Sequence, residues 1–179
     1  MIIGFMGKGG SGKTTLATLC ARFFADQGKT VLAIDADHNM DLAFNLLEPE
    51  TRPAYLGGSI EAFRRAAGME PKETYQRRLA RAPLPAFSLR PADPFTAAHA
   101  QPVSDRLSVM AAGPHTEEIR FGAACSHALA APLKVYLPCL SLREGEAVVV
   151  DSTAGMDMVG TGIAAGMDVV FIASEPTVH

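Results

Sequence analysis

Nine consecutive residues near the start of the chain have the composition of a phosphate-binding loop. Residues 7–15 read Gly-Lys-Gly-Gly-Ser-Gly-Lys-Thr-Thr, between an apolar run at 1–6 and a helical pattern at 14–27. Glycines permit positive φ, so backbone N–H groups can approach an anion, and the new helix adds its positive N-terminal end. The spacing predicts that Lys13 reaches the β- and γ-phosphates and that the Thr14 hydroxyl faces Mg²⁺. The alternative is a glycine-rich turn that only joins a strand to a helix.

Carboxylates follow two further apolar runs, Val-Leu-Ala-Ile at 31–34 and Ala-Val-Val-Val at 147–150. The acidic residues at and after the ends of these runs are Asp35, Asp37, Asp41 and Asp151. A strand that ends in an aspartate can place the carboxylate near the Mg²⁺ of a nucleotide site, because Mg²⁺ prefers oxygen ligands. We therefore expect Asp35 and Asp151 to join Thr14 in a magnesium shell. For Asp35, the alternative is the cap of a helix or turn.

These residues need a sheet that brings the ends of its strands together. Apolar runs predict strands at 1–6, 30–34, 107–111, 147–150 and 169–173, and periodicity predicts helices at 14–27, 40–47, 123–129 and 158–165. The alternation predicts an α/β fold, with a mostly parallel sheet, helices on both faces and the site at the carboxyl ends of the strands. In the first helix, we expect a buried apolar face made of Leu16, Leu19, Cys20, Phe23 and Phe24.

A proline- and arginine-rich insert at 52–105 interrupts this alternation. We expect short helices at 59–67 and 71–81, and a long irregular loop at 83–102. The insert is expected to be peripheral to the single domain that spans 1–179. Its arginines predict a solvated surface, with docking of an acidic partner as the alternative; they are Arg64, Arg65, Arg77, Arg78 and Arg81.

Composition excludes several classes of protein. The chain has 179 residues, 48% of them hydrophobic and 20% charged, as expected for one globular domain with a real core. A net charge of −3 argues against a nucleic-acid surface, and no apolar run is long enough to span a membrane. The chain begins directly with a core strand, and three cysteines do not make a disulfide framework. We therefore expect a cytoplasmic protein without a membrane or nucleic-acid partner.

A second lysine in the loop, Lys8, is not needed for ordinary phosphate binding. The pattern Lys-Gly-Gly-x-Gly-Lys-Thr-Thr resembles the deviant Walker A loop of the ATPases that include MinD, ParA, the nitrogenase iron protein and CooC. This resemblance implies a P-loop fold of the SIMIBI type and a dimeric, ATP-hydrolysing switch that binds ATP, ADP and Mg²⁺. It also implies that Lys8 crosses the interface of a homodimer to touch the partner's nucleotide. The alternative for Lys8 is a solvated surface lysine.

The resemblance also implies roles for individual residues. Asp37 would position or activate the attacking water, and Asp41 would be associated with Mg²⁺. The stretch from Asp151 resembles the family's second switch, in which the Gly155 N–H meets the γ-phosphate. The residues expected to contact the nucleotide are Gly7, Lys8, Gly9, Gly10, Ser11, Gly12, Lys13, Thr14, Thr15 and Gly155. The resemblance further implies that Lys13, Lys8 and Asp37 are the catalytic residues.

The CooC branch, accessory ATPases of nickel insertion into carbon monoxide dehydrogenase, is the nearest resemblance. It rests on Val-Leu-Ala-Ile-Asp-Ala-Asp at 31–37, Ala-Gly-Met at 154–156 and Glu-Pro-Thr at 175–177. CooC-type proteins carry Cys-x-Cys before the second acidic strand, and two protomers share one metal ion. Here the pair is Cys125 and His127, which could supply a shared Zn²⁺ or Ni²⁺ site in a dimer. The alternative is a buried cysteine beside a surface histidine.

Other functions stay open at this stage. A switch of the MinD or ParA type, which controls positioning or assembly, is one alternative, and a nucleotide-binding protein that does not hydrolyse ATP is another. Family members continue beyond the position that corresponds to His179, so we expect the C-terminal strands of the fold and the adenine contacts to be missing from this chain. Ala154 stands where the nitrogenase iron protein has a cluster-binding cysteine, which disfavours an iron–sulfur cluster.

Overall fold

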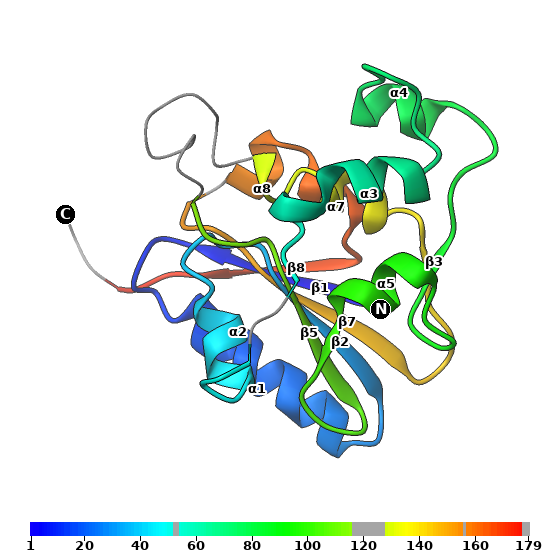
Figure 1. Ribbon diagram of the computed structural model, residues 1–179. Helices are drawn as coiled ribbons and strands as arrows, with labels where there is room; N and C mark the ends of the chain where they lie inside the picture. Colours follow the sequence, from blue (N-terminus) through cyan, green and yellow to red (C-terminus); the bar gives the residue numbers. More distant parts are fainter. Residues whose placement is uncertain (52–53, 116–127, 156, 177–179) are drawn as a thin grey trace.

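A six-stranded sheet forms the centre of the molecule in the computed structural model, which describes residues 1–51, 54–115, 128–155 and 157–176 (Figure 1). Its order is β4-β5-β2-β7-β1-β8. Five strands run parallel: β1 (Ile2–Gly7), β2 (Thr30–Asp35), β5 (Leu107–Ala111), β7 (Glu146–Asp151) and β8 (Val169–Ala173). The short β4 (Gln101–Pro102) pairs antiparallel with β5 at one edge. The mostly parallel α/β fold expected from the sequence is confirmed.

The register of the central strands places the acidic ends together. In the pairing of β2 with β7, Asp35 lies opposite Asp151, and in that of β7 with β1, Asp151 lies opposite Phe5. Every residue of β1 and β7 is buried, which is why these strands are apolar without alternation. Because parallel strands end at the same edge, this register brings both carboxylates to one end of the sheet.

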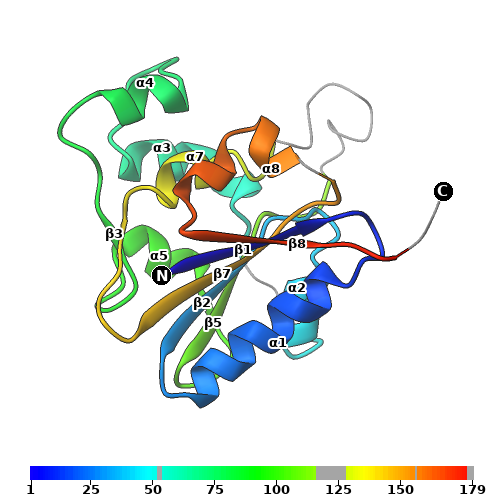
Figure 2. The same ribbon diagram turned by 180° about the vertical axis from the view of Figure 1, so that it is seen from behind.

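One face of the sheet is covered by α1 (Lys13–Asp26) and α2 (Asp41–Leu46), which lie on the same side (Figures 1 and 2). The helix α1 touches the sheet through Ala17 and Ala21, which are completely buried. The apolar face expected for this helix is wrong for three of its five members, because Leu16, Leu19 and Phe23 are exposed by about half or more, whereas Cys20 and Phe24 pack partly buried against the core. Small alanines let the helix lie close to the strands, and the larger residues turn outward toward β8.

The other face carries a cluster of aromatic residues under α3 (Ile60–Ala66), α5 (Pro94–His99) and α7 (Leu133–Tyr136). Rings from four separate elements contact one another with centroids within about 6 Å: Phe63, Phe87, Phe95 and Tyr136. Three of these four rings come from the 52–105 insert. The expectation that the insert is peripheral is therefore wrong, since it supplies much of the core on this face.

The stretch expected to be an irregular loop at 83–102 contains ordered elements. Phe87–Ser88 forms β3, which pairs with β6 (Leu140–Ser141), and the helix α5 begins directly after Asp93. The Asp93 carboxylate accepts hydrogen bonds from the N–H groups of Phe95 and Thr96, and Pro94 occupies the first turn. This is a strong start signal that a search for apolar periodicity overlooked in so short a helix.

The other helices are shorter than expected. The helix predicted at 71–81 spans Tyr75–Ala80 (α4), and its first turn is capped by the Thr74 hydroxyl. The helix predicted at 158–165 divides into α8 (Asp157–Gly160) and a 3-10 turn, η3 (Ile163–Gly166), around Gly162. A further 3-10 turn, η1 (Gly57–Ser59), precedes α3. Within the described residues, no helix has the length and apolar character that crossing a bilayer requires.

Candidate nucleotide-binding site

The glycine-rich loop joins β1 to α1 at the carboxyl edge of the sheet. Gly7 has φ 146°, and a Cβ atom on it would overlap the carbonyl oxygen of Ala173 in β8. Gly12, directly before α1, has φ 86° and leaves the first helical N–H groups without a side-chain cap. These conformations favour glycine, as the sequence predicted for the loop. The uncapped N-terminus leaves donors that can serve an anion.

Lys13 is the first residue of α1 and is only 8% exposed. The structure thus buries this side chain at the base of the loop. Its charge lies close enough to Asp151 to lower the pKa of that carboxyl. The two residues therefore form an electrostatic pair below the loop, and Lys13 is already held in the site.

Asp151 ends β7 with both carboxylate oxygens buried and, among the described residues, without a hydrogen-bond partner. Its pKa is raised to about 6, mainly by burial; the Thr14 hydroxyl and the charge of Lys13 oppose this rise, and the carboxylates of Asp37 and Asp41 add to it. The Thr14 hydroxyl is thus near Asp151, although no hydrogen bond to either oxygen meets the usual geometric limits. A buried carboxylate beside a hydroxyl offers oxygen ligands of the kind that a hard cation prefers.

Asp35 is fully buried and holds the backbone that follows β2. One carboxylate oxygen accepts the Asp37 N–H at 3.1 Å, and the other accepts the Ala43 N–H at 2.9 Å. Burial raises the pKa of this carboxyl to about 7, against the lowering effect of these hydrogen bonds. The structure therefore shows Asp35 in the anchoring role that was the alternative to a magnesium ligand.

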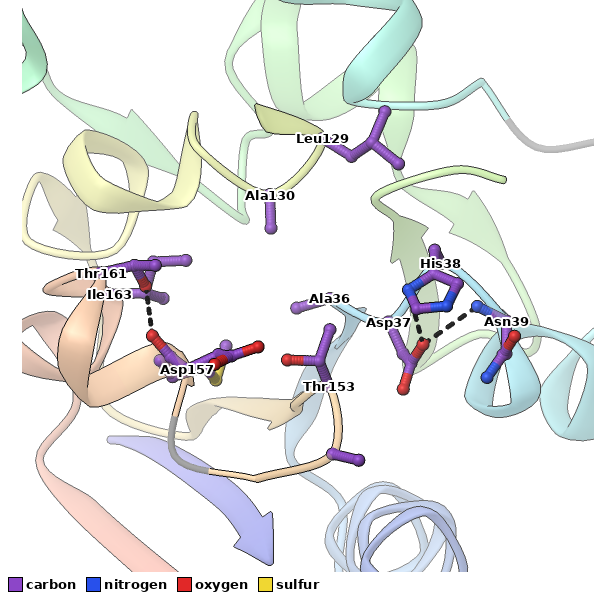
Figure 3. Close-up of a pocket in the computed structure, with 12 residues that line it drawn as sticks. Ala36, Asp37, His38, Asn39, Leu129, Ala130, Thr153, Asp157, Thr161 and Ile163 are labelled. Atoms are coloured by element: carbon purple, nitrogen blue, oxygen red, sulfur yellow. Dashed lines mark hydrogen bonds and ion pairs between the residues drawn. The ribbon is translucent and has the colours of Figure 1, made fainter. Parts of the chain in front are cut away.

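Asp37 lies on the loop between β2 and α2 and is also buried. Its Oδ1 atom accepts the Asn39 N–H at 3.0 Å and lies 3.4 Å from Nδ1 of His38 (Figure 3). Together with Thr153, these residues line a cavity of about 350 Å³, to which Met158 and Ile163 contribute apolar walls. Figure 3 shows Asp37 and Thr153 projecting from two different loops at this cavity. The sequence did not single out His38.

A second, more open hollow of about 650 Å³ lies over the phosphate loop. It is lined by Lys8, Gly9 and Ser11 from the loop, and by Ala154 and Glu175 from the segments after β7 and β8. Ala154 borders both hollows, so the phosphate loop and the Asp37 cavity share a wall. A nucleotide on the loop would therefore lie next to the cavity that Asp37 lines.

Comparison with known proteins identifies this arrangement. Residues 2–168 match the CobQ/CobB/MinD/ParA nucleotide binding domain. The chain belongs to that family. This match covers most of the sequence, and it agrees with a loop, a buried acid and a parallel sheet arranged around one nucleotide site.

Two curated relatives of the CobQ/CobB/MinD/ParA family align along nearly the entire chain. An ATP-binding protein of Methanocaldococcus jannaschii is 31% identical over 99% of this chain and 68% of its own length. The carbon monoxide dehydrogenase accessory protein CooC of Rhodospirillum rubrum is 29% identical over 98% of this chain and 63% of its own length. The chain thus spans about two thirds of each relative, and a CooC-like relationship is confirmed.

A solved structure supports the fold of this family member. The crystal structure of a ParA family ATPase from Chlorobium tepidum aligns with a TM-score of 0.62 at 20% identity, over 98% of this chain and 61% of that one. At this identity the likeness shows the fold alone. It agrees with the sheet and helix arrangement seen here.

Of the remaining residues expected at the family's site, some lie near the phosphate loop and others lie outside the described residues. Asp41 is the exposed first residue of α2, near enough to Asp151 to affect its pKa. The Gly155 N–H, expected to meet the γ-phosphate, instead donates to the Gly7 carbonyl at 2.8 Å, so the second switch lies against the loop. Cys125 and His127 lie outside the described residues. Across the described part of the chain, no group of three or more metal-binding side chains occurs.

Proposed function

We propose that this nucleotide-binding domain hydrolyses ATP with the help of Mg²⁺. The observation that carries the proposal is the buried Asp151 carboxylate, which has no hydrogen-bond partner among the described residues and lies beside Thr14 at the foot of the phosphate loop. Such a group costs free energy unless a cation or proton satisfies it. Its raised pKa reflects that cost.

The donors at this position fit Mg²⁺. Thr14 offers a hydroxyl and Asp151 a carboxylate, both hard oxygen ligands, and Asp41 is close enough to act through the same shell. When bound, Mg²⁺ neutralises charge on the terminal phosphates. Asp35 is the weakest member of the expected set, because both of its oxygens already accept backbone N–H groups.

Each protein group then has a separate task in the proposed reaction. The backbone N–H groups of residues 7–15 bind the phosphates, and Lys13 neutralises the β- and γ-phosphates from within the site. Asp37 orients the attacking water from the neighbouring cavity. Phosphoryl transfer needs mainly positioning and charge stabilisation, which this arrangement of a buried lysine and loop donors can supply.

The finer proposal is a dimeric switch that handles a metal. Lys8 lines the open hollow over the loop, where a second copy could present its own lysine to the phosphates. The relationship to CooC supports a role in delivering nickel, as cargo, to a client metalloenzyme such as carbon monoxide dehydrogenase. In this proposal Cys125 and His127 of two copies hold one Ni²⁺ or Zn²⁺ ion in the reducing cytoplasm.

Phosphate release from Mg·ATP tests the catalytic proposal. Asp37→Asn keeps the shape of the side chain but removes its charge, so turnover should fall by roughly 10²–10⁴ while ATP affinity changes little. Asp105→Asn, in an exposed loop, is the matched control and should behave as wild type. Wild-type protein that binds Mg·ATP without releasing phosphate would show a nucleotide-binding protein that is not an ATPase.

Sedimentation with metal titration tests the switch. We expect ATP to favour dimers, Lys8→Ala to weaken the dimer more than nucleotide binding, and one Ni²⁺ or Zn²⁺ ion to bind per dimer. Cys125→Ser and His127→Ala should each remove the metal, whereas Cys139→Ser should not, since Cys139 is buried in the hydrophobic core. ATP-dependent dimers without metal would favour the positioning or assembly role instead.

A further inference from the structure

Two histidines from neighbouring strand ends meet beside Asp37. The rings of His38 and His115 lie parallel, with an interplanar angle of 12° and centroids 3.9 Å apart. His38 comes three residues after β2 and His115 four residues after β5. The pairing of these strands, with Asp35 opposite Ala111, is what brings the two segments together.

The backbone near His115 is itself anchored to the site. The Ala112 N–H donates to the Asp35 carbonyl at 2.7 Å, and the Ala112 carbonyl accepts the Gly57 N–H at 2.9 Å. The chain therefore leaves β5 along a defined path before it reaches His115. The His115 ring stacks on the His38 ring. Its Nε2 atom is buried and has no hydrogen-bond partner among the described residues.

His38 in turn contacts the Asp37 carboxylate. The distance from Nδ1 to Oδ1 is 3.4 Å, an ion-pair distance that is longer than a short hydrogen bond. The same oxygen accepts the Asn39 N–H, so two donors converge on one side of the carboxylate. Contacts of this kind tighten when a reacting group arrives. The second carboxylate oxygen projects away from both of these donors, as Figure 3 shows.

We propose that His38 is a positioning residue, which orients the Asp37 carboxylate through Nδ1 while the His115 ring holds the imidazole in place. This inference rests on the proposed ATPase function, because it assigns the orientation of the group that aligns water. Because the His38 ring is stacked on His115, it has few alternative rotamers, and the Asp37 carboxylate that it contacts keeps one orientation. The alternative, a solvated surface histidine, does not account for the contacts of the His38 ring with both His115 and Asp37.

Four variants separate the donor from the stack. His38→Phe keeps an aromatic ring on His115 but removes the donor, and should lower kcat by roughly tenfold with the Kd for Mg·ATP unchanged. His38→Asn returns a donor near the Nδ1 position and should recover part of that loss. His115→Ala removes the clamp, and His115→Phe restores it, so the first should lose more activity than the second. Equal kcat for His38→Phe and wild type would overturn the proposal.

Nitrogen NMR of the His38 ring supplies a readout that does not depend on hydrolysis. If Nδ1–H donates to Asp37, the proton should reside on Nδ1 in the neutral ring of the wild type, and should shift toward Nε2 in Asp37→Ala. A His38 ring protonated mainly on Nε2 in both the wild type and Asp37→Ala would contradict the positioning role, whatever the rate of ATP hydrolysis. Conversely, if the tautomer depends on Asp37 but the protein does not hydrolyse ATP, the contact between His38 and Asp37 stands and only the ATPase proposal is refuted.

Discussion

The helix α1 and the 52–105 insert cover opposite faces of one sheet, and they do so with different side chains. The helix packs through Ala17 and Ala21 and leaves Leu19 and Phe23 exposed. The insert packs through large rings, of which Phe63 is completely buried against Phe87 and Phe95. The face that carries the phosphate loop is therefore held by close backbone approach, while the other is held by aromatic burial.

This difference separates function from stability within the molecule. The loop, Lys13 and the start of α1 belong to one short segment whose local conformation makes an anion site. The insert has no described part in the phosphate site, yet it encloses the core beneath β2, β7 and β1. Changes in the loop and at the start of α1 should thus affect nucleotide binding with little effect on folding, and changes among the buried rings of the insert should do the reverse.

The largest expected effect is on stability. Phe63→Ala removes a fully buried ring from the insert, and we expect it to lower the free energy of unfolding by about 3–5 kcal/mol, because a cavity is left among packed aromatics. Leu19→Ala, on the exposed side of α1, is the matched control and should change it by less than about 0.5 kcal/mol. Urea unfolding followed by circular dichroism measures both. A small loss for Phe63→Ala would restore the idea of a peripheral insert.

The next effect is on binding. Lys13→Met keeps the apolar stem but removes the ammonium group, so the Kd for Mg·ATP should rise by roughly tenfold to a hundredfold, the value of a charged hydrogen bond. The unfolding midpoint should fall little or rise, since the variant removes a buried charge. Isothermal titration calorimetry measures the affinity, with Lys29→Met in the loop after α1 as a control. Unchanged affinity in Lys13→Met would remove this lysine from the site.

A smaller effect concerns pH. Burial raises the Asp35 pKa from 3.8 to about 7, so the folded protein binds a proton more tightly than the unfolded chain. This contribution to stability is fully present below pH 4 and is lost as the pH rises through 7, and the Asp151 pKa of about 6 acts in the same direction. From pH 5 to pH 8, the free energy of unfolding of the wild type should therefore fall relative to that of Asp35→Asn, because the asparagine does not titrate. A constant difference across urea titrations at both pH values would contradict the raised pKa.

The smallest effect distinguishes the outer part of the insert from its core. Thr74 caps α4 by accepting the Arg77 N–H at 3.2 Å, in an exposed position. Thr74→Ala should cost about 1 kcal/mol or less, and Thr74→Ser should retain most of the cap. Thermal unfolding of the three proteins measures this. A loss as large as that of Phe63→Ala would mean that α4 is as essential to the fold as the aromatic cluster.

Much of the site could be predicted because it depends on neighbours in the sequence. The positive φ of Gly7 and Gly12, the helix that begins at Lys13 and the strand that ends at Asp151 all follow from a short run of residue types. The same local reasoning missed α5, although its Asp93-Pro94 start is a recognisable cap, because a six-residue helix shows too little periodicity. For Asp35, local reasoning favoured a magnesium ligand and gave the cap of a helix or turn only as the alternative.

Local sequence alone determined the phosphate loop, the five parallel strands and the aspartates at the strand ends, because backbone conformation and apolar runs are properties of consecutive residues. Only the tertiary structure decided which face of α1 is buried, that Lys13 lies inside the site, and that the insert completes the core. It likewise decided that His38 meets His115 and that the Gly155 N–H binds Gly7. These outcomes depend on contacts between residues far apart in the chain, which form only when the strands take their places in the sheet.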